Sequence, residues 1–100
     1  MHVRVRVPTP LRELVGGART VEIAVAPPPA GDGTVTVAAV LDAIATEHPA
    51  LERRVRDEQG RTRVHVNLFV GADNVRDRGG LTTPIGPGEE LSIIPAISGG

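Results

Sequence analysis

Apolar and polar residues alternate in four separate segments of the chain, and a period of two predicts β-strands. The segments are residues 1–7, 20–25, 64–70 and 90–95. Val75 indicates a further short edge strand or bridge. Alternation places one face of each strand toward a core. The residues expected to face that core are Val3, Val5, Val7, Val21, Ile23, Val25, Val64, Val66, Leu68, Val70, Leu91 and Ile93.

A different period follows Thr36, where apolar residues recur at the three- and four-residue spacing of an amphipathic helix. These residues are Val37, Val40, Leu41, Ile44 and Ala45. Thr36 is placed to cap the N-terminus of this helix, and Pro49 is expected to end it. Leu51 and Val55 predict one further short helical turn against the same core.

Proline and glycine mark the connections between these elements. Pro8 and Pro10 end the first strand, because proline cannot donate to a central ladder. Residues 27–33 form a loop by composition, and residues 79–81 form a tight turn. Pro87-Gly88 fits the centre of a type II turn.

The element order is strand, strand, helix, strand, short strand, strand, which predicts a two-layer α+β domain. We expect a mixed sheet of four to five strands packed on one main helix. The pattern resembles the β-grasp, or ubiquitin-like roll, in which the first and last strands lie parallel at the centre of the sheet. The domain is expected to span residues 1–95, with residues 96–100 as a flexible Gly-Gly tail.

Composition limits the chemistry that such a domain can perform. The 100 residues suffice for one domain, with 40% apolar residues, 23% charged residues and a net charge of -1. The chain has no Cys, all 11 cationic residues are Arg, and Phe69 is the only aromatic residue. Disulfides, Cys-ligated metals, thiol nucleophiles and Schiff bases are excluded. Near-neutral charge and one aromatic argue against nucleic acid as a partner.

The N-terminus shows no targeting segment, and no apolar run approaches the roughly 20 residues that span a bilayer. We therefore expect a cytoplasmic protein without a membrane partner. Its histidines, at positions 2, 48 and 65, lack the spacing of metal ligands, so no metal site is expected. Glu89 and Glu90 point to opposite faces of a strand. With no catalytic group and no cofactor of its own, the chain is expected to be a carrier or binding module rather than an enzyme.

The last residues have the properties of a reactive tail. Gly99 and Gly100 lack a Cβ atom and so permit close backbone approach in a narrow channel. The five residues after Pro95 reach at most about 17 Å when extended. That reach would place the carboxylate of Gly100 in a partner's active site while the globular domain stays outside. Ile97 and Ser98 belong to the same tail.

Two large apolar residues are predicted to lie on the outer face of the sheet. Phe69 alternates with the core-facing residues of its strand, and Ile94 alternates with Leu91 and Ile93. In a β-grasp their strands are neighbours. Together they would form an exposed apolar patch suited to partner docking.

Several segments resemble the MoaD/ThiS family of ubiquitin-like sulfur carriers. The resemblance lies in residues 66–76, 79–85 and 87–95, followed by the final Gly-Gly. Residues 11–14 and the helix ending at His48-Pro49 also fit. The part from Asn67 to Gly100 most resembles the branch of the family that serves cysteine biosynthesis. The loop at residues 27–33 is longer than the family pattern.

The resemblance implies a specific use of Gly100. A ubiquitin-activating-like enzyme, an adenylyltransferase and sulfurtransferase, would use ATP to adenylate its carboxylate. A persulfide sulfur would then replace AMP and leave a thiocarboxylate. The implied acceptor is a pyridoxal-phosphate-dependent cysteine synthase holding an aminoacrylate, and a metalloprotease would release cysteine from the carrier.

Other functions remain open at this point. The acceptor could instead be the large subunit of molybdopterin synthase or the thiazole synthase of the thiamine pathway. A ubiquitin-like protein modifier would use Gly100 to form isopeptide bonds. A purely structural β-grasp interaction domain would not use Gly100 at all.

Overall fold

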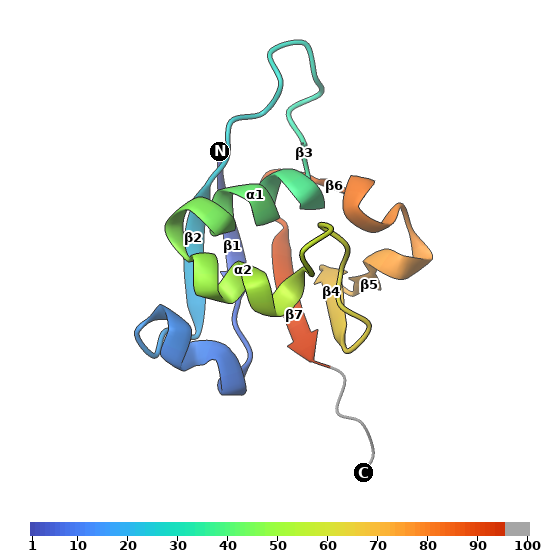
Figure 1. Cartoon of the computed structure of the whole chain (residues 1–100). Coiled ribbons are helices and arrows are strands. Elements are labelled where there is room, and N and C mark those ends of the chain that lie inside the picture. The colour runs from blue at the N-terminus through green and yellow to red at the C-terminus, as the bar shows by residue number, and fades with distance from the viewer. Residues whose placement is uncertain (96–100) are drawn as a thin grey trace.

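Five strands form the main sheet, in the order β2-β1-β7-β4-β5. The computed structural model describes residues 1–95, and Figure 1 shows the helices packed across one face of this sheet. The strands are β1 (His2–Arg6), β2 (Thr20–Ala24), β4 (Val66–Val70), β5 (Asp73–Asn74) and β7 (Glu90–Pro95).

The first and last strands lie side by side at the centre of the sheet. β1 pairs with β7 in parallel, and Val5 lies opposite Leu91. β7 pairs with β4 in antiparallel orientation, and Leu68 lies opposite Ile93. A parallel central pair with a helix crossing one face is the arrangement of the β-grasp, so the predicted strand order is confirmed.

Within residues 1–95, the helical layer contains two α-helices, α1 (Val37–Glu47) and α2 (Pro49–Val55). The side chain of Thr36 accepts a hydrogen bond from the N–H of Ala39 at 3.1 Å, which confirms the predicted cap. Pro49 ends α1 and also begins α2, because proline is well tolerated in the first turn of a helix. The second helix is therefore longer than the single turn predicted from Leu51 and Val55.

In the described part of the chain, three 3₁₀ helices connect these elements: η1 (Thr9–Val15), η2 (Val75–Asp77) and η3 (Gly80–Thr82). The turn before β7 has the predicted type II form. Gly88 has a φ of 82°, and the N–H of Glu89 donates to the carbonyl of Gly86 at 3.1 Å. This turn sets the alternation of β7, with Leu91 and Ile93 directed toward the helices.

Most of the predicted core is confirmed. The apolar residues of β1, β4 and β7 that were assigned to the inner face are buried, as are Ile23 and Val25 from the second strand. Four apolar residues of α1 pack on them: Val37, Val40, Leu41 and Ile44. Val21 is only half-buried, because it lies on the edge strand β2.

The prediction for Val64 is wrong. Its side chain is 78% exposed, because β4 begins only at Val66. The N–H of Val66 donates to the carbonyl of Arg63 at 3.0 Å, so the chain turns immediately before the strand. β7 pairs with β4 as far as the Val66–Pro95 pair, and Val64 lies beyond that ladder.

Two further details differ from the prediction. A two-stranded sheet joins β3 (Val35–Thr36) to β6 (Pro84–Ile85), and it was not anticipated. The short edge strand is Asp73–Asn74, while Val75 follows it as a buried residue of η2.

The long segment between β2 and β3 contains the predicted loop and projects from one end of the molecule, whereas β7 ends at the opposite end (Figure 1). Among residues 1–95, no helix has both the length and the apolar character required to cross a bilayer.

Candidate docking surfaces around the C-terminal strand

The strand that leads to the terminal segment is firmly held in the sheet. β7 has a hydrogen-bonded neighbour on each side, and Pro95, its last residue, lies opposite Val66. The predicted tail residues Ile97, Ser98, Gly99 and Gly100 lie outside the described residues. What the structure defines is the point at which the chain leaves the sheet and the surfaces beside that point.

The outer face of β7 and β4 carries the two predicted docking residues. Phe69 lies opposite Ser92, and Ile94 lies opposite Asn67, so Phe69 and Ile94 are diagonal neighbours on adjacent strands. Ile94 is 44% exposed and Phe69 is half-buried. The predicted position of both residues on this face is confirmed, while their role in docking remains a prediction.

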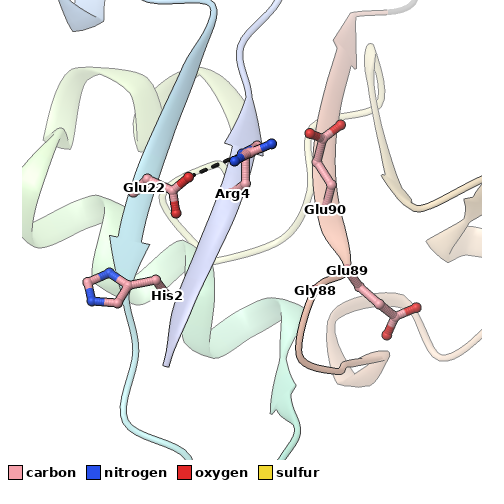
Figure 2. Close-up of a pocket in the computed structure, with 6 residues that line it drawn as sticks. All are labelled: His2, Arg4, Glu22, Gly88, Glu89 and Glu90. Atoms are coloured by element: carbon pink, nitrogen blue, oxygen red, sulfur yellow. Dashed lines mark hydrogen bonds and ion pairs between the residues drawn. The ribbon is translucent and has the colours of Figure 1, made fainter.

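The same face becomes charged toward the other end of the strands. Arg4 lies between Glu22 and Glu90 in the register of three adjacent strands. Its Nε atom lies 3.1 Å from Glu22 Oε1, and Arg6 Nε lies 3.5 Å from Glu90 Oε1. Figure 2 shows the shallow polar pocket of about 230 Å³ that includes Arg4, Glu22 and Glu90. Apolar Ile94 is thus at the end of the face where the chain exits.

A second surface lies beside the end of β7, on the side of α2. It is a groove of about 590 Å³, which we call the exit groove. Its lining residues are Leu11, Arg53, Arg54, Asp57, Arg63, Val64, His65, Val66 and Pro95. This groove was not predicted from the sequence, because Val64 was expected to face the core. The exposed Val64 side chain is instead part of the apolar lining of the groove.

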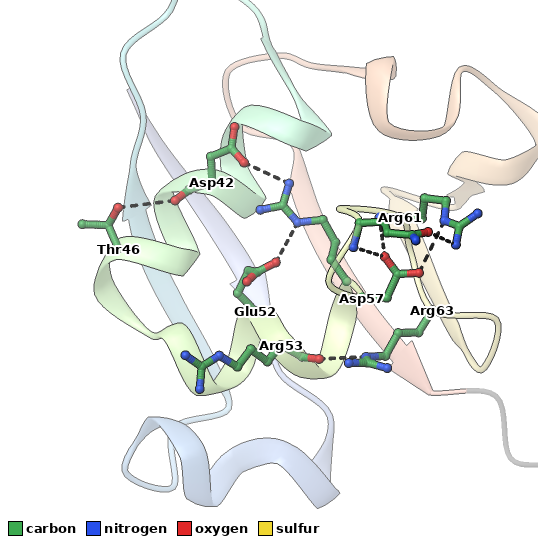
Figure 3. Close-up of polar contacts among 9 residues, drawn as sticks. Asp42, Thr46, Glu52, Arg53, Asp57, Arg61 and Arg63 are labelled. Carbon is green, nitrogen blue, oxygen red and sulfur yellow. Dashed lines mark hydrogen bonds and ion pairs between the residues drawn. The ribbon is translucent and has the colours of Figure 1, made fainter.

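A polar network connects the two helices behind this groove (Figure 3). Arg56 contacts Asp42 of α1 at 2.9 Å and Glu52 of α2 at 2.8 Å. Burial by itself lowers the pKa of Arg56, but hydrogen bonds and charge from Glu52 and Asp42 outweigh it and raise that pKa. The side chains of Arg56 and Glu52 are only 11% and 17% exposed, so this network holds the two helices together, while Asp42 at its end is 72% exposed.

Asp57 is also engaged within its own loop. Its carboxylate accepts hydrogen bonds from the backbone N–H groups of Gln59 and Arg61, at 2.9 and 3.0 Å. Chiefly because of the Arg61 N–H, the pKa of Asp57 lies below its usual value. The Nε of Arg61 lies 3.5 Å from the second carboxylate oxygen. Asp57 therefore has local partners for its charge.

The part of the chain that the structure describes contains no cluster of three or more potential metal ligands. Gly79 and Gly80 lie at the start of the 3₁₀ turn η3, which is a connection between elements and not a phosphate loop preceding an α-helix. The residues brought together around the end of β7 are mostly apolar and cationic, with Asp57 and His65 among them, and such a mixture suits protein recognition.

Residues 5–100 match the sequence profile described as the ThiS family. The chain belongs to this family of ubiquitin-like sulfur carriers, as its sequence predicted. The sulfur carrier protein CysO of Mycobacterium tuberculosis is 33% identical over 102 residues, with full coverage of both chains. The small archaeal modifier protein 1 of Haloferax volcanii is 36% identical over 86 residues, covering 86% of this chain and 87% of that protein.

Solved structures agree with the sequence relatives. A chain of the Amycolatopsis orientalis BexX/CysO complex has a TM-score of 0.80 at 32% identity, covering 98% of this chain and 99% of that chain. Mycobacterium tuberculosis CysO has a TM-score of 0.78 at 32% identity, covering 95% and 99%. The SAMP1 crystal structure from Haloferax volcanii has a TM-score of 0.76 at 31% identity, covering 100% of both. The predicted β-grasp fold is confirmed.

Proposed function

We propose that this protein carries sulfur as a thiocarboxylate on Gly100 and delivers it to cysteine biosynthesis. The observation that supports this most directly is the full-length similarity to CysO, a sulfur carrier protein. The family match also extends through residue 100. The lack of a catalytic constellation among the described residues is compatible with a protein on which other enzymes act.

The proposed chemistry takes place on the main-chain carboxylate. An activating enzyme joins a carboxylate oxygen of Gly100 to the α-phosphorus of ATP and releases pyrophosphate. The terminal sulfur of a persulfide attacks the acyl carbon and AMP leaves; a thiol then cleaves the acyl disulfide and liberates the thiocarboxylate. Adenylation is needed because a free carboxylate has no adequate leaving group, whereas AMP is one.

In the proposed delivery step, the thiocarboxylate sulfur adds to an aminoacrylate held by a pyridoxal-phosphate enzyme. The product is the carrier joined to cysteine through a thioester, which rearranges to an amide when the cysteine amine attacks the acyl carbon. Hydrolysis of that amide by a metalloprotease would return the Gly100 carboxylate. BexX is the protein found with a CysO in one related structure, so a carrier of this fold does form a complex with another protein.

The experiment is intact-mass analysis of the full chain after incubation with ATP, an activating enzyme from the same source and a sulfur donor. Replacement of one oxygen by one sulfur at the C-terminus is expected. A chain lacking Gly100 is the matched control and should show no change. An unchanged mass of the intact chain under conditions that consume ATP would overturn the proposal.

Protein modification is the second candidate, because the chain is 36% identical to a small archaeal modifier protein. It would use the same activated Gly100, but a lysine amine would attack in place of sulfur. The two functions are separated by supplying lysine-rich acceptor proteins in the same reaction without a sulfur donor. Isopeptide adducts on those proteins would favour the modifier. In a parallel reaction that contains a sulfur donor, addition of the thiocarboxylate sulfur to an aminoacrylate would favour cysteine biosynthesis.

A further inference from the structure

The arginines of this chain fall into two groups. Of the 11, five form ion pairs with described carboxylates, which leaves six that do not. The paired ones are Arg4, Arg6, Arg56, Arg61 and Arg78. The other six are Arg12, Arg19, Arg53, Arg54, Arg63 and Arg76. A net charge of -1 conceals this division.

Four of the second group gather where β7 ends. Arg53 and Arg54 are in the last turn of α2 and, with Arg63, line the exit groove. The Nε of Arg63 donates to the carbonyl of Arg53 at 2.8 Å, an interaction drawn in Figure 3. Arg76 donates to the carbonyl of Val66 at 2.8 Å, beside the last pair of the β4–β7 ladder.

Among the described residues, no carboxylate lies within 4.0 Å of these four guanidinium groups, although Arg53 and Arg63 also line a second pocket that contains Asp42, Glu52 and Glu58. The carboxylate that lines the exit groove, Asp57, is occupied by Arg61 and by two backbone N–H groups. Arg53, Arg54, Arg63 and Arg76 are all exposed. Their partners within the described residues are backbone carbonyls and one amide oxygen, that of Asn67. The positive charge at this corner is therefore available to another molecule.

The proposed function indicates which kind of protein must cover the exit groove. Five residues follow Pro95 and reach at most about 17 Å when extended. An enzyme that acts on Gly100 must therefore come close to the end of β7 and cover the groove beside it. Covering unpaired guanidinium groups with neutral protein would remove them from water without compensation. Carboxylates on the partner would supply that compensation and would also speed the encounter.

We propose that the exit groove docks an acidic protein surface, the rim of the partner channel that receives the C-terminal residues. Arg53, Arg54 and Arg63 would pair with carboxylates of that rim, with Arg76 adding charge beside them. Val64, which is 78% exposed, would supply the apolar contact between the charges. This inference rests on the proposed function for its choice of partner, but its charge preference can be measured independently.

The direct test uses the full chain labelled with ¹⁵N and titrated with hexaglutamate, with hexaglutamine as the neutral control. Amide shifts are expected at residues 53, 54 and 63–65, weakening as salt is added. The double variant Arg53→Glu/Arg54→Glu should lose them. Arg78→Glu is the control, because Arg78 is also exposed to solvent but pairs with Asp73 at 2.7 Å in another part of the fold.

The outcomes of this titration are distinct. Shifts that are equal in the double variant, or that map to another surface, would overturn the proposal. A DNA oligonucleotide of equal charge is included, and shifts with the oligonucleotide alone would indicate a phosphate-binding surface and would also overturn it.

The second test measures formation of the thiocarboxylate by the activating enzyme. Arg53→Glu/Arg54→Glu should lower kcat/KM for the carrier by about tenfold, mainly through slower association, and added salt should narrow the difference. Arg78→Glu should match the wild type. Equal rates in all three proteins would overturn the acidic-rim inference and leave the carrier function standing. No thiocarboxylate in the wild type would instead reject the carrier function, and the peptide titration would still decide the charge preference.

Discussion

The two faces of β7 share one backbone but have opposite surroundings. On the inner face, Leu91 and Ile93 are 0% and 1% exposed and pack beneath the helices. On the outer face, Ser92 is half-buried and Ile94 is 44% exposed, without a helical layer above them. The inner face therefore holds the strand in place, while the outer face is free to meet a partner next to the point where the chain exits.

The largest expected effect is on the inner face. Ile93→Ala should reduce the free energy of unfolding by about 2–5 kcal/mol, because it removes buried methyl groups and leaves a cavity in the core between the sheet and the helices. A domain of this size has only about 5–15 kcal/mol in total. Ile94→Ala, one residue further on, should change it by about 0.5 kcal/mol or less.

Urea denaturation monitored by far-UV circular dichroism measures both variants, since the chain has no tryptophan to report by fluorescence. A similar loss of stability for the two variants would show that the outer face also contributes to the core, and the contrast between the faces would then be rejected.

The second effect is on binding. Ile94→Asp and Phe69→Asp should each raise the Kd for the activating enzyme at least tenfold, about 1.4 kcal/mol, because a carboxylate would be desolvated against an apolar partner surface. Thr20→Asp is the control, since Thr20 lies on the same outer face but on the distant edge strand. Isothermal titration calorimetry measures the Kd, using variants whose melting temperature shows that they are folded. Unchanged affinity for both Ile94 and Phe69 variants would contradict docking on this patch.

The contrast between the faces was largely visible in the sequence. Successive side chains of a strand point to opposite faces of the sheet. The alternation in β4 and β7 therefore predicted that Phe69 and Ile94 lie on the outer face. The cap at Thr36 followed from residue chemistry just before an amphipathic helix. The parallel pairing of β1 and β7 did not follow from periodicity, and came from the resemblance to a known family.

The misplaced elements have local physical reasons. A ladder of two residues, such as β3 with β6, is too short to show any period. Val64 continues the alternation of β4, but alternation does not reveal where the partner strand stops. Because β7 reaches only to the Val66–Pro95 pair, Val64 is exposed and becomes part of the exit groove. The sequence therefore gave no indication of that groove.

The third effect is on the stability of α1, the helix that covers the inner face of the sheet. Thr36→Ala should cost about 1 kcal/mol, because the N–H of Ala39 loses the side-chain acceptor at 3.1 Å. Thr46→Ala is the matched control within the same helix. Its hydroxyl makes only a 3.5 Å contact with the Asp42 carbonyl, and alanine has the higher helix propensity. Equal destabilisation of both variants in urea would argue against a stabilising cap.

The smallest effect is expected at the charged end of the outer face. Glu22→Gln removes one partner of Arg4, but both side chains are more than half exposed, so the loss of stability should be between about 0.2 and 1 kcal/mol. Screening should remove most of it at about 1 M salt, where the Debye length is only about 3 Å. Glu52→Gln is the counterpart within the helical layer, where the Arg56 and Glu52 side chains are mostly buried. Its loss should be larger and should persist in salt, because solvent ions screen a buried pair far less. If salt abolished both losses equally, the Arg56–Glu52 pair would be screened as strongly as the exposed Arg4–Glu22 pair. That result would contradict the expected difference in solvent access between the helical layer and the outer face of the sheet.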